Sequence, residues 1–317
     1  MISRRLIRIK IVQVLYSHIN NEDVSLQATE KEYHLSVKKT YDLYHYFLFL
    51  LVKVADYANE RIDIARNKIL PTREDLNPNT RFVDNPIIHM LRDSRGLTNY
   101  ITENKLSWAD NPEIIKKLLQ KITESEYYNK YMSDPKNSFE KDKEFITNIF
   151  TVEFEGWELL YQLLEEQSIF WNDDIEFVLG MILKTIEHFK ENRLEAKLMP
   201  IYKNDEDRDF GIKLLRKSVI NYSTYRELID KYTKNWEVER IAAMDILIMV
   251  VAINEIMEFP SIPIKVTLNE YIDIARFYST AKSNEFVNGI LDKIVIDLQN
   301  ENKIVKTGRG LMSGKEK

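Results

Sequence analysis

Apolar residues recur along this chain at helical rather than alternating spacing. Residues 2–19 are apolar on nearly every side, a pattern typical of a buried helix. Residues 30–70 form a long helical stretch rich in Leu, Phe and Tyr, which Pro71 is expected to end. No segment alternates strongly enough to indicate a strand, and no internal repeat is found. The sequence therefore predicts an all-α protein.

Residue types at the boundaries predict where the other helices begin and end. Pro, Asn and Asp residues between 71 and 86 indicate a loop. Asn111 followed by Pro112 is typical of a helix start, and this helix is expected to reach about Met132. Thr224 and Thr267 each precede a Glu by three residues, which is the capping-box pattern. The further helices expected span about residues 138–150, 154–168, 173–192, 206–221, 224–235, 238–258, 268–278 and 284–300.

The amino-acid composition limits the folds, ligands and reaction types that this chain can support. The 317 residues include only 8 Gly and 8 Pro and no Cys, which disfavours all-β folds and Gly-rich phosphate loops and excludes thiolate or disulfide chemistry. The five His residues are scattered without metal-ligand spacing, so no metal and no cofactor are expected. The longest aliphatic run, Ile246–Ile253, is too short for a membrane span, and the basic N-terminus does not resemble a secretory signal. A cytoplasmic location fits these features.

The net charge is −5, so any binding of nucleic acid must use a local patch. Arg4, Arg5 and Arg8 fall within about 100° of one another on a helical wheel. Guanidinium groups pair with phosphates and stack on bases, so these three residues suit an anionic partner. The plainer interpretation is a solvated charge cluster at the start of the chain.

Two further regions carry candidate RNA contacts. Tyr16 and Phe286 could stack on unpaired bases, although most aromatic residues belong to a core. Ser283 is a plausible N-cap preceded by Lys282, an arrangement that can bind a phosphate or can simply cap a helix.

Three separated segments resemble the family of the bacterial transcription antitermination factor NusB. The opening Arg4-Arg5-x-x-Arg8 followed by Val12-Gln13-Val14-Leu15-Tyr16-Ser17 is similar to the first helix of that family. Near the other end, Ile262-Pro263 through Asn269-Glu270 to Ala275-Arg276 resembles its IP-x-x-V-x-INEA-x-ELAK signature. The run Ser283-Asn284-Glu285-Phe286-Val287-Asn288-Gly289-Ile290-Leu291-Asp292-Lys293 is similar to its S-x-KFVNGVLDK helix.

The resemblance implies a domain organisation. Residues 1–20 and 204–300 would form a NusB-like fold of two packed helical subdomains. Residues 21–203 would be a helical insertion of unknown role, and the basic tail 301–317 is expected to be disordered. The first helix should then pack against residues 204–300, and most of Ile246–Ile253 should be core.

The resemblance also implies a function. Members of this family bind a single-stranded RNA element, boxA, in ribosomal RNA transcripts, jointly with a small-subunit ribosomal protein called NusE in that role. They act with RNA polymerase and other Nus factors to resist termination. The matching positions make Arg4, Arg5, Arg8, Tyr16, Lys282, Ser283 and Phe286 the expected RNA-binding residues, and Asp245 an exposed partner-binding residue. The sequence departs from the family pattern at Leu6, Ile9, Lys10, Leu268, Tyr271 and Val250; the last puts partner contacts in doubt.

Two other functions could use a helical fold of this kind. The same helical fold precedes a methyltransferase domain in ribosomal-RNA cytosine methyltransferases, but those enzymes need a catalytic Cys and a Gly-rich cofactor turn after a strand. This chain has no Cys, and Gly308-x-Gly310 follows no predicted strand, so an enzyme is not expected. The alternative is a helical protein-interaction scaffold that has lost RNA binding, which would not need to keep the N-terminal arginines.

Overall fold

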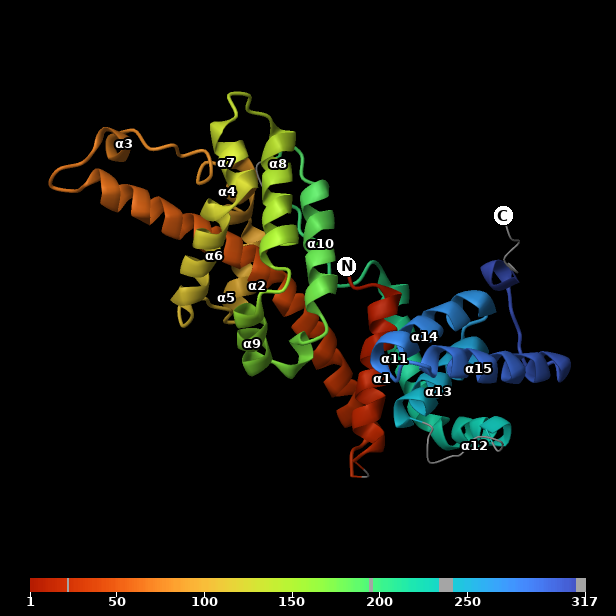
Figure 1. Ribbon diagram of the computed structural model, residues 1–317. Helices are drawn as coiled ribbons and strands as arrows, with labels where there is room; N and C mark the ends of the chain where they lie inside the picture. The colour runs from red at the N-terminus through yellow and green to blue at the C-terminus, as the bar shows by residue number, and fades with distance from the viewer. Residues whose placement is uncertain (22, 194–195, 234–241, 312–317) are drawn as a thin grey trace. The chain divides into compact units, whose positions relative to one another are not determined.

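The computed structural model describes residues 1–21, 23–193, 196–233 and 242–311, and within these ranges the regular structure is helical, without strands. The helices form two compact units, and each is described by itself. Unit 1 holds Met1 and Lys38–Ile201, and unit 2 holds Ile2–Val37 with Tyr202–Lys317. The long helix α2 (Leu26–Arg66) contributes residues to both. The all-α prediction is confirmed (Figure 1).

Unit 2 corresponds to the NusB-like part expected from the sequence, with different boundaries. It takes in the chain as far as Val37, whereas the expected first segment stopped at residue 20. Its helices are α1 (Arg4–Ile19), the start of α2, α11 (Asp205–Ile220), α12 (Tyr222–Thr233), α13 (Ala243–Glu258), α14 (Ile264–Tyr278) and α15 (Ser283–Asn300). The first residues expected in the 238–258 helix, 238–241, and the end of the 224–235 helix lie outside the described residues.

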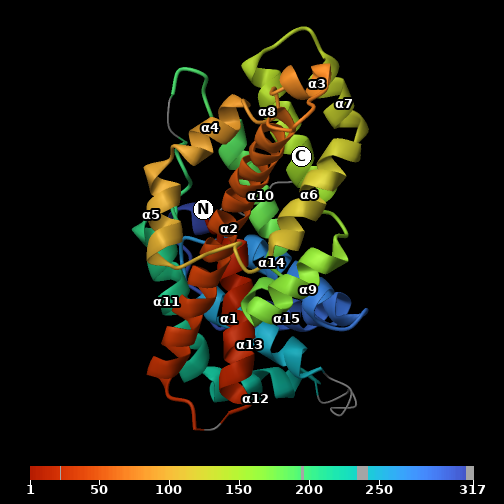
Figure 2. The same cartoon turned by 90° about the vertical axis from the view of Figure 1, so that its left-hand side faces the viewer.

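The first helix packs on the second half of the chain, as predicted. α1 lies against α11 and α13 (Figures 1 and 2). Its apolar residues Ile7, Ile11 and Leu15 are completely buried. The run Ile246–Ile253 on α13 is also buried, because α13 is surrounded by α1, α11, α12, α14 and α15. An all-round apolar helix is stable only in such a central position.

A glycine allows three helices of unit 2 to approach closely. Gly211 on α11 is buried, and a Cβ atom at this position would overlap the Tyr33 hydroxyl of α2 and touch Ile7 of α1. Tyr33 is itself fully buried. Residues 23–37 therefore belong to the same packed unit as α1 and α11.

The beginning of the tail is ordered, contrary to the expectation for 301–317. Lys306 donates from Nζ to the carbonyl oxygens of Ile256 and Phe259, at 2.8 and 3.1 Å. The Thr307 amide donates to the Pro260 carbonyl, and Gly310 is buried in the short 3₁₀ turn η4 (Gly308–Leu311). The bond to Ile256 satisfies a carbonyl group in the last turn of α13 that the helix itself leaves unpaired, and the other bonds attach the segment to Phe259 and Pro260 just after the helix. Residues 312–317 lie outside the described residues.

Unit 1 is a separate helical body with its own core. Besides the remainder of α2, it contains α3 (Arg73–Leu76), α4 (Pro86–Arg92), α5 (Arg95–Glu103), α6 (Pro112–Glu124), α7 (Glu126–Ser133), α8 (Phe139–Asn148), the π-helical turn η1 (Ile149–Glu153), α9 (Glu158–Gln167), the 3₁₀ turn η2 (Ile169–Trp171) and α10 (Ile175–Glu187). Tyr44, Phe47 and Leu51 of α2 are buried in this core. Trp108 stacks on Tyr46 with ring centres 3.9 Å apart and donates to its carbonyl oxygen.

Several predicted helix boundaries are wrong. The helix expected from 112 to about 132 is broken at Ser125, whose hydroxyl donates to the Ile122 carbonyl and accepts from the Tyr128 amide. Neither predicted capping box exists, because α12 and α14 begin before Thr224 and Thr267. The short helices α3, α4 and α5 were not predicted.

No helix among the described residues is long and apolar enough to cross a membrane.

Replacing Gly211 with Ala should destabilise unit 2. The added methyl group must displace Tyr33 or Ile7, and overpacking of this kind costs about 1–3 kcal/mol. The exposed Gly289 on α15, where a Cβ would meet nothing, is the matched control, and its change to Ala should be neutral or slightly stabilising. Urea unfolding of the two variants measures the difference. Equal stabilities would contradict the close approach of the three helices.

The stability of unit 1 should fall as the pH drops from 6.5 towards 4. His45 on α2 is buried against Tyr100, with ring centres 3.8 Å apart, and burial lowers its pKa to about 4. Below pH 6.5 the imidazole of His45 binds a proton in the unfolded chain but stays neutral in the folded protein. The free energy of unfolding therefore falls as the pH drops, by up to about 3 kcal/mol near pH 4. An NMR titration of the His45 ring checks the pKa, with the exposed His34 as control. A His45 ring that titrates near 6.5 would contradict this account.

Candidate nucleic-acid interface

The three N-terminal arginines lie on α1 but have very different environments. Arg8 is only 4% exposed, and its guanidinium forms two hydrogen bonds with Glu255 of α13, Nε to Oε2 at 2.7 Å and Nη2 to Oε1 at 2.8 Å. Glu270 of α14 lies 3.5 Å from Arg8 Nη1. Arg8 is therefore enclosed by carboxylates inside unit 2 and does not lie on the surface.

Glu255 is the centre of this buried cluster. Its Oε1 also accepts a hydrogen bond from the Thr267 hydroxyl at 2.8 Å, and its Oε2 accepts one from the Tyr271 hydroxyl at 2.9 Å. Burial by itself would lower the pKa of Arg8, but the hydrogen bonds and charge of Glu255 outweigh it, so the pKa is raised and the guanidinium stays charged. Burial, with the charge of Glu255, raises the pKa of Tyr271 well above its usual range. The hydroxyl therefore stays protonated and donates.

Arg4 is tied to the start of α11. Its Nε donates to Asp207 and its Nη2 to Glu206, both at 2.7 Å, and its guanidinium lies 5.0 Å from the centre of the Phe210 ring. Burial opposes the charge, but these hydrogen bonds raise the pKa of Arg4 and lower the pKa of Glu206. Arg4 is partly exposed, but its donors are directed at carboxylates.

Arg5 is the member of the triad that opens most to solvent. Its Nη1 lies 3.3 Å from Asp273 Oδ2 of α14, longer than the hydrogen bonds of Arg4 or Arg8, and both side chains are partly exposed. The other oxygen of Asp273 lies 3.6 Å from Arg276. The carboxylate of Asp273 therefore contacts the guanidinium groups of both Arg5 on α1 and Arg276 on α14, which lie on the same surface.

The start of α15 differs from the expected arrangement. Ser283 is the first residue of the helix rather than its N-cap, and it is 1% exposed. Its hydroxyl donates to Asp245 Oδ2 at 2.8 Å and accepts from the Thr280 amide. Asp245 is 4% exposed, so the expectation of an exposed carboxylate there is wrong: it receives this internal hydrogen bond at the first turn of α13.

The remaining predicted residues are accessible to different degrees. Lys282 is exposed directly before α15, and Phe286 is partly buried one turn into the helix. Tyr16 is 44% exposed. It lies eleven residues after Arg5, so it projects from the same side of α1 about 16 Å further along. Val250 is completely buried and belongs to the core of unit 2.

Comparison with known proteins identifies this helical body. Residues 176–295 match the model of the NusB family. The transcription antitermination protein NusB of Salinibacter ruber is 40% identical over 114 residues, which are 36% of this chain and 71% of that protein. The chain belongs to the NusB family. The protein of the same name from Chloroherpeton thalassium is 39% identical over 105 residues (33% of this chain, 50% of that protein), and that from Alkaliphilus oremlandii 32% over 107 residues (34% and 78%). No solved structure matches the chain.

The family match begins later in the chain than α1, yet α1 is part of the same fold. The matched residues run from Glu176 in α10 of unit 1 to Val295 in α15, and they include α11 to α14. α1 supplies the arginine that pairs with Glu255 of this region, and it packs on α11 and α13. α1 therefore belongs to the same packed unit as most of the matched region.

Sequence reasoning missed two candidate residues at the end of α14. Phe277 is 72% exposed, an unusual position for a large aromatic ring, and it follows the exposed Arg276. Arg5 lies near Arg276 because both contact Asp273. Lys282 comes later in the sequence, directly before α15. We call Arg5, Arg276, Phe277 and Lys282 the α1–α14 surface. The helical period could have indicated Phe277, because it falls outside the apolar stripe of Tyr271, Ile274 and Ala275. Within the described residues no cluster of metal-ligating side chains is found.

Replacing Arg8 with Met should strongly destabilise unit 2. The change leaves Glu255 buried without its counter-charge, and breaking a buried ion pair costs about 3–5 kcal/mol. Arg5→Met is the matched control on the same helix, and it should cost less than about 1 kcal/mol because its ion pair is exposed. Urea unfolding of both variants measures the ratio. A loss at Arg8 as small as that at Arg5 would mean that the pair is not the buried link described above.

Proposed function

We propose that this chain is a non-catalytic, cytoplasmic RNA-binding factor for transcription antitermination. In this proposal it binds a boxA-like single-stranded element of ribosomal RNA transcripts, together with the small-subunit ribosomal protein NusE, in a complex with RNA polymerase and other Nus factors. The name of the three relatives supports the antitermination role. The observation that carries RNA binding is the α1–α14 surface, where Arg5 and Arg276 share the carboxylate of Asp273, and the exposed Phe277 and Lys282 follow Arg276 along the chain.

The chemistry of this surface fits unpaired RNA. Arginine and lysine contact phosphates, and an exposed aromatic ring stacks on a base whatever its identity. Tyr16 and Phe286 are included as flanking aromatic contacts. Arg4 enters as a secondary contact, because carboxylates occupy its donors. Arg8 and Ser283 support the site from inside the fold, since both are buried.

The NusE contact is assigned to the face around the start of α13. Asp245 acts there through its hydrogen bond to Ser283, which orders the beginning of α15, rather than by direct contact. An Asp245 variant should therefore lose partner binding and stability together.

A helical interaction scaffold is the second candidate. The observation that favours it is the pairing of Arg4 and Arg8 with carboxylates, which removes two of the three N-terminal arginines from a free cationic patch. A direct RNA-binding measurement, with and without the NusE protein of the same organism, separates the two candidates. A scaffold would retain the protein and ignore the RNA.

Replacing Arg5, Arg276 and Lys282 together with Ala should weaken the binding of boxA-like RNA. The affinity that remains should depend less steeply on salt concentration. Each phosphate of a single strand that the protein neutralises adds about 0.7 to the log–log salt slope, so removing three such cations should reduce the slope by about 2. Phe277→Ala should instead lower affinity by about 1–3 kcal/mol with little change in slope. Fluorescence anisotropy over a salt titration measures both effects.

The matched control removes three exposed cations from other parts of unit 2, Arg226, Lys231 and Lys293. This variant has the same net charge as the first, so it should retain most of the affinity. Equal binding by wild type and the Arg5, Arg276 and Lys282 variant would count against the site. An equal loss in both triple variants would indicate binding by net charge alone.

A further inference from the structure

Unit 1 contains a cavity of about 440 Å³ between α2, the segment 79–83, α6 and α7. This volume falls in the range of small-ligand pockets. Residues at helical spacing line it from two sides: Ala58, Arg61 and Ile62 from α2, and Lys116, Leu119, Gln120 and Thr123 from α6. We call this cavity the α2–α6 groove.

The charges in the α2–α6 groove are all positive. Arg61 and Lys116 are exposed at its rim, and no ion pair holds either of them within the described part of the chain. None of the described lining residues is Asp or Glu. The surrounding segment is acidic, with 28 Asp and Glu against 22 Lys and Arg in residues 38–201. A cavity with two unpaired cations and no carboxylate in such a segment favours an anionic ligand.

The interior of the groove is apolar and aromatic. Val83 and Leu119 are buried at its base. Tyr128 is partly exposed and meets Phe82 edge-on, with ring centres 6.2 Å apart and planes at 75°. Phe82 is buried, so Tyr128 is the more accessible of the two aromatic rings that line the groove. A planar group can stack there while its charged part reaches the rim.

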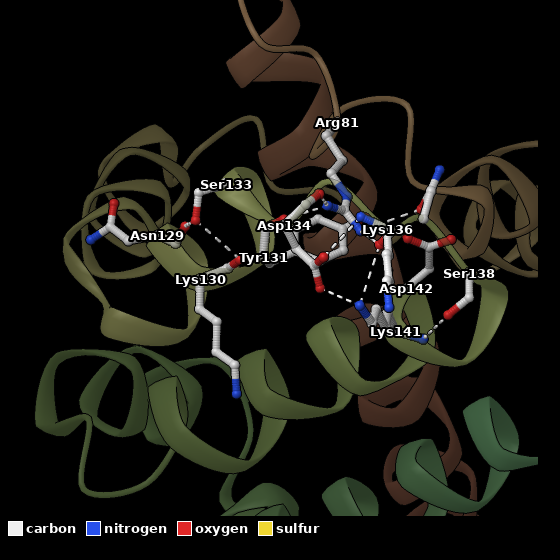
Figure 3. Close-up of polar contacts among 11 residues, drawn as sticks. Arg81, Asn129, Lys130, Tyr131, Ser133, Asp134, Lys136, Ser138, Lys141 and Asp142 are labelled. Atoms are coloured by element: carbon white, nitrogen blue, oxygen red, sulfur yellow. Dashed lines mark hydrogen bonds and ion pairs between the residues drawn. The ribbon is translucent and has the colours of Figure 1, made fainter.

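The wall of the groove is held rigid by Arg81. Its Nη1 donates to the carbonyl oxygens of Tyr131 and Asp134, both at 2.6 Å, and its guanidinium lies over the Tyr131 ring at 4.1 Å (Figure 3). Lys141 and Asp134 form an ion pair in the same loop. Asn79 adds a bond from Nδ2 to the Met132 carbonyl. Segment 79–83 is thus fastened to the end of α7, and a preformed site loses less free energy on binding.

We propose that the α2–α6 groove binds an unpaired nucleotide of single-stranded RNA. The base stacks on Tyr128 over the apolar base of the cavity, and Arg61 and Lys116 bind the flanking phosphates. An acidic peptide would also satisfy the cations. The compact cavity with one accessible ring suits a single planar base better than an extended peptide. This site is independent of the α1–α14 surface and of the antitermination proposal.

The test uses the full chain carrying Arg5→Ala, Arg276→Ala and Lys282→Ala, which removes the cations of the α1–α14 surface. The probe is a short unstructured RNA labelled with fluorescein, followed by anisotropy. Adding Arg61→Ala and Lys116→Ala should weaken the remaining binding about 10-fold or more and lower the salt slope by about 1.4. Tyr128→Leu should weaken it about 5- to 100-fold with an unchanged slope.

The matched control is Lys117→Ala with Lys130→Ala, two exposed lysines on α6 and α7 that do not line the groove. It should leave the affinity nearly unchanged. The proposal is overturned if the background chain binds no RNA, if the control pair weakens binding as much as the groove pair, or if hexaglutamate displaces the RNA at equal concentration. Because Arg61 and Lys116 are exposed, their variants should melt like the background chain, so a failure to fold does not decide the result.

Discussion

The fold of unit 2 depends on one buried carboxylate. Glu255 accepts hydrogen bonds from Arg8, Thr267 and Tyr271, which lie on α1 and α14, and Glu255 itself lies on α13. A charge removed from water costs several kcal/mol unless its lone pairs are satisfied, and here four hydrogen bonds satisfy both oxygens. The cost of leaving any of these partners unpaired fixes the register of the three helices. Apolar packing around α13 would by itself permit small slips, because it has no direction.

This arrangement separates structural from available cations. An arginine that forms hydrogen bonds with carboxylates has fewer donors left for phosphate, so Arg4 is only partly available, and Arg8, which is also buried, is unavailable. Arg5 and Arg276 share a single exposed carboxylate at longer distances, and water screens such contacts strongly. A phosphate can therefore compete with Asp273 far more easily than with Glu255. The number of cations along the sequence is a poor guide to an RNA surface, since the carboxylates that neutralise Arg4 and Arg8 come from distant segments of the chain.

The core of unit 1 is built around α2. α2 contributes a run of buried apolar residues, and apolar and aromatic residues from the later helices and loops pack against it. Polar atoms in this core form hydrogen bonds: Tyr100 donates to Asp42, and Thr40 donates to Asp174. His45 remains neutral among aromatic rings, which makes the insertion sensitive to acid. The α2–α6 groove lies at the edge of this core, where Arg61 and Lys116 are exposed.

The sequence by itself determined the helical class, because apolar residues recur at the 3.6-residue helical period in nearly every element. It also determined the family, since the Ile262–Arg276 and Ser283–Lys293 motifs follow each other in order, and the burial of Ile246–Ile253, since an all-apolar helix must be central. Only the tertiary structure decided which arginines are exposed, where the capping hydroxyls bond, and that Asp245 is buried beneath Ser283. The helical wheel places Arg4, Arg5 and Arg8 on one side of α1, but it contains no information about Glu206, Asp273 or Glu255. Those partners come from distant segments, and their distances to the arginines exist only after the chain has folded.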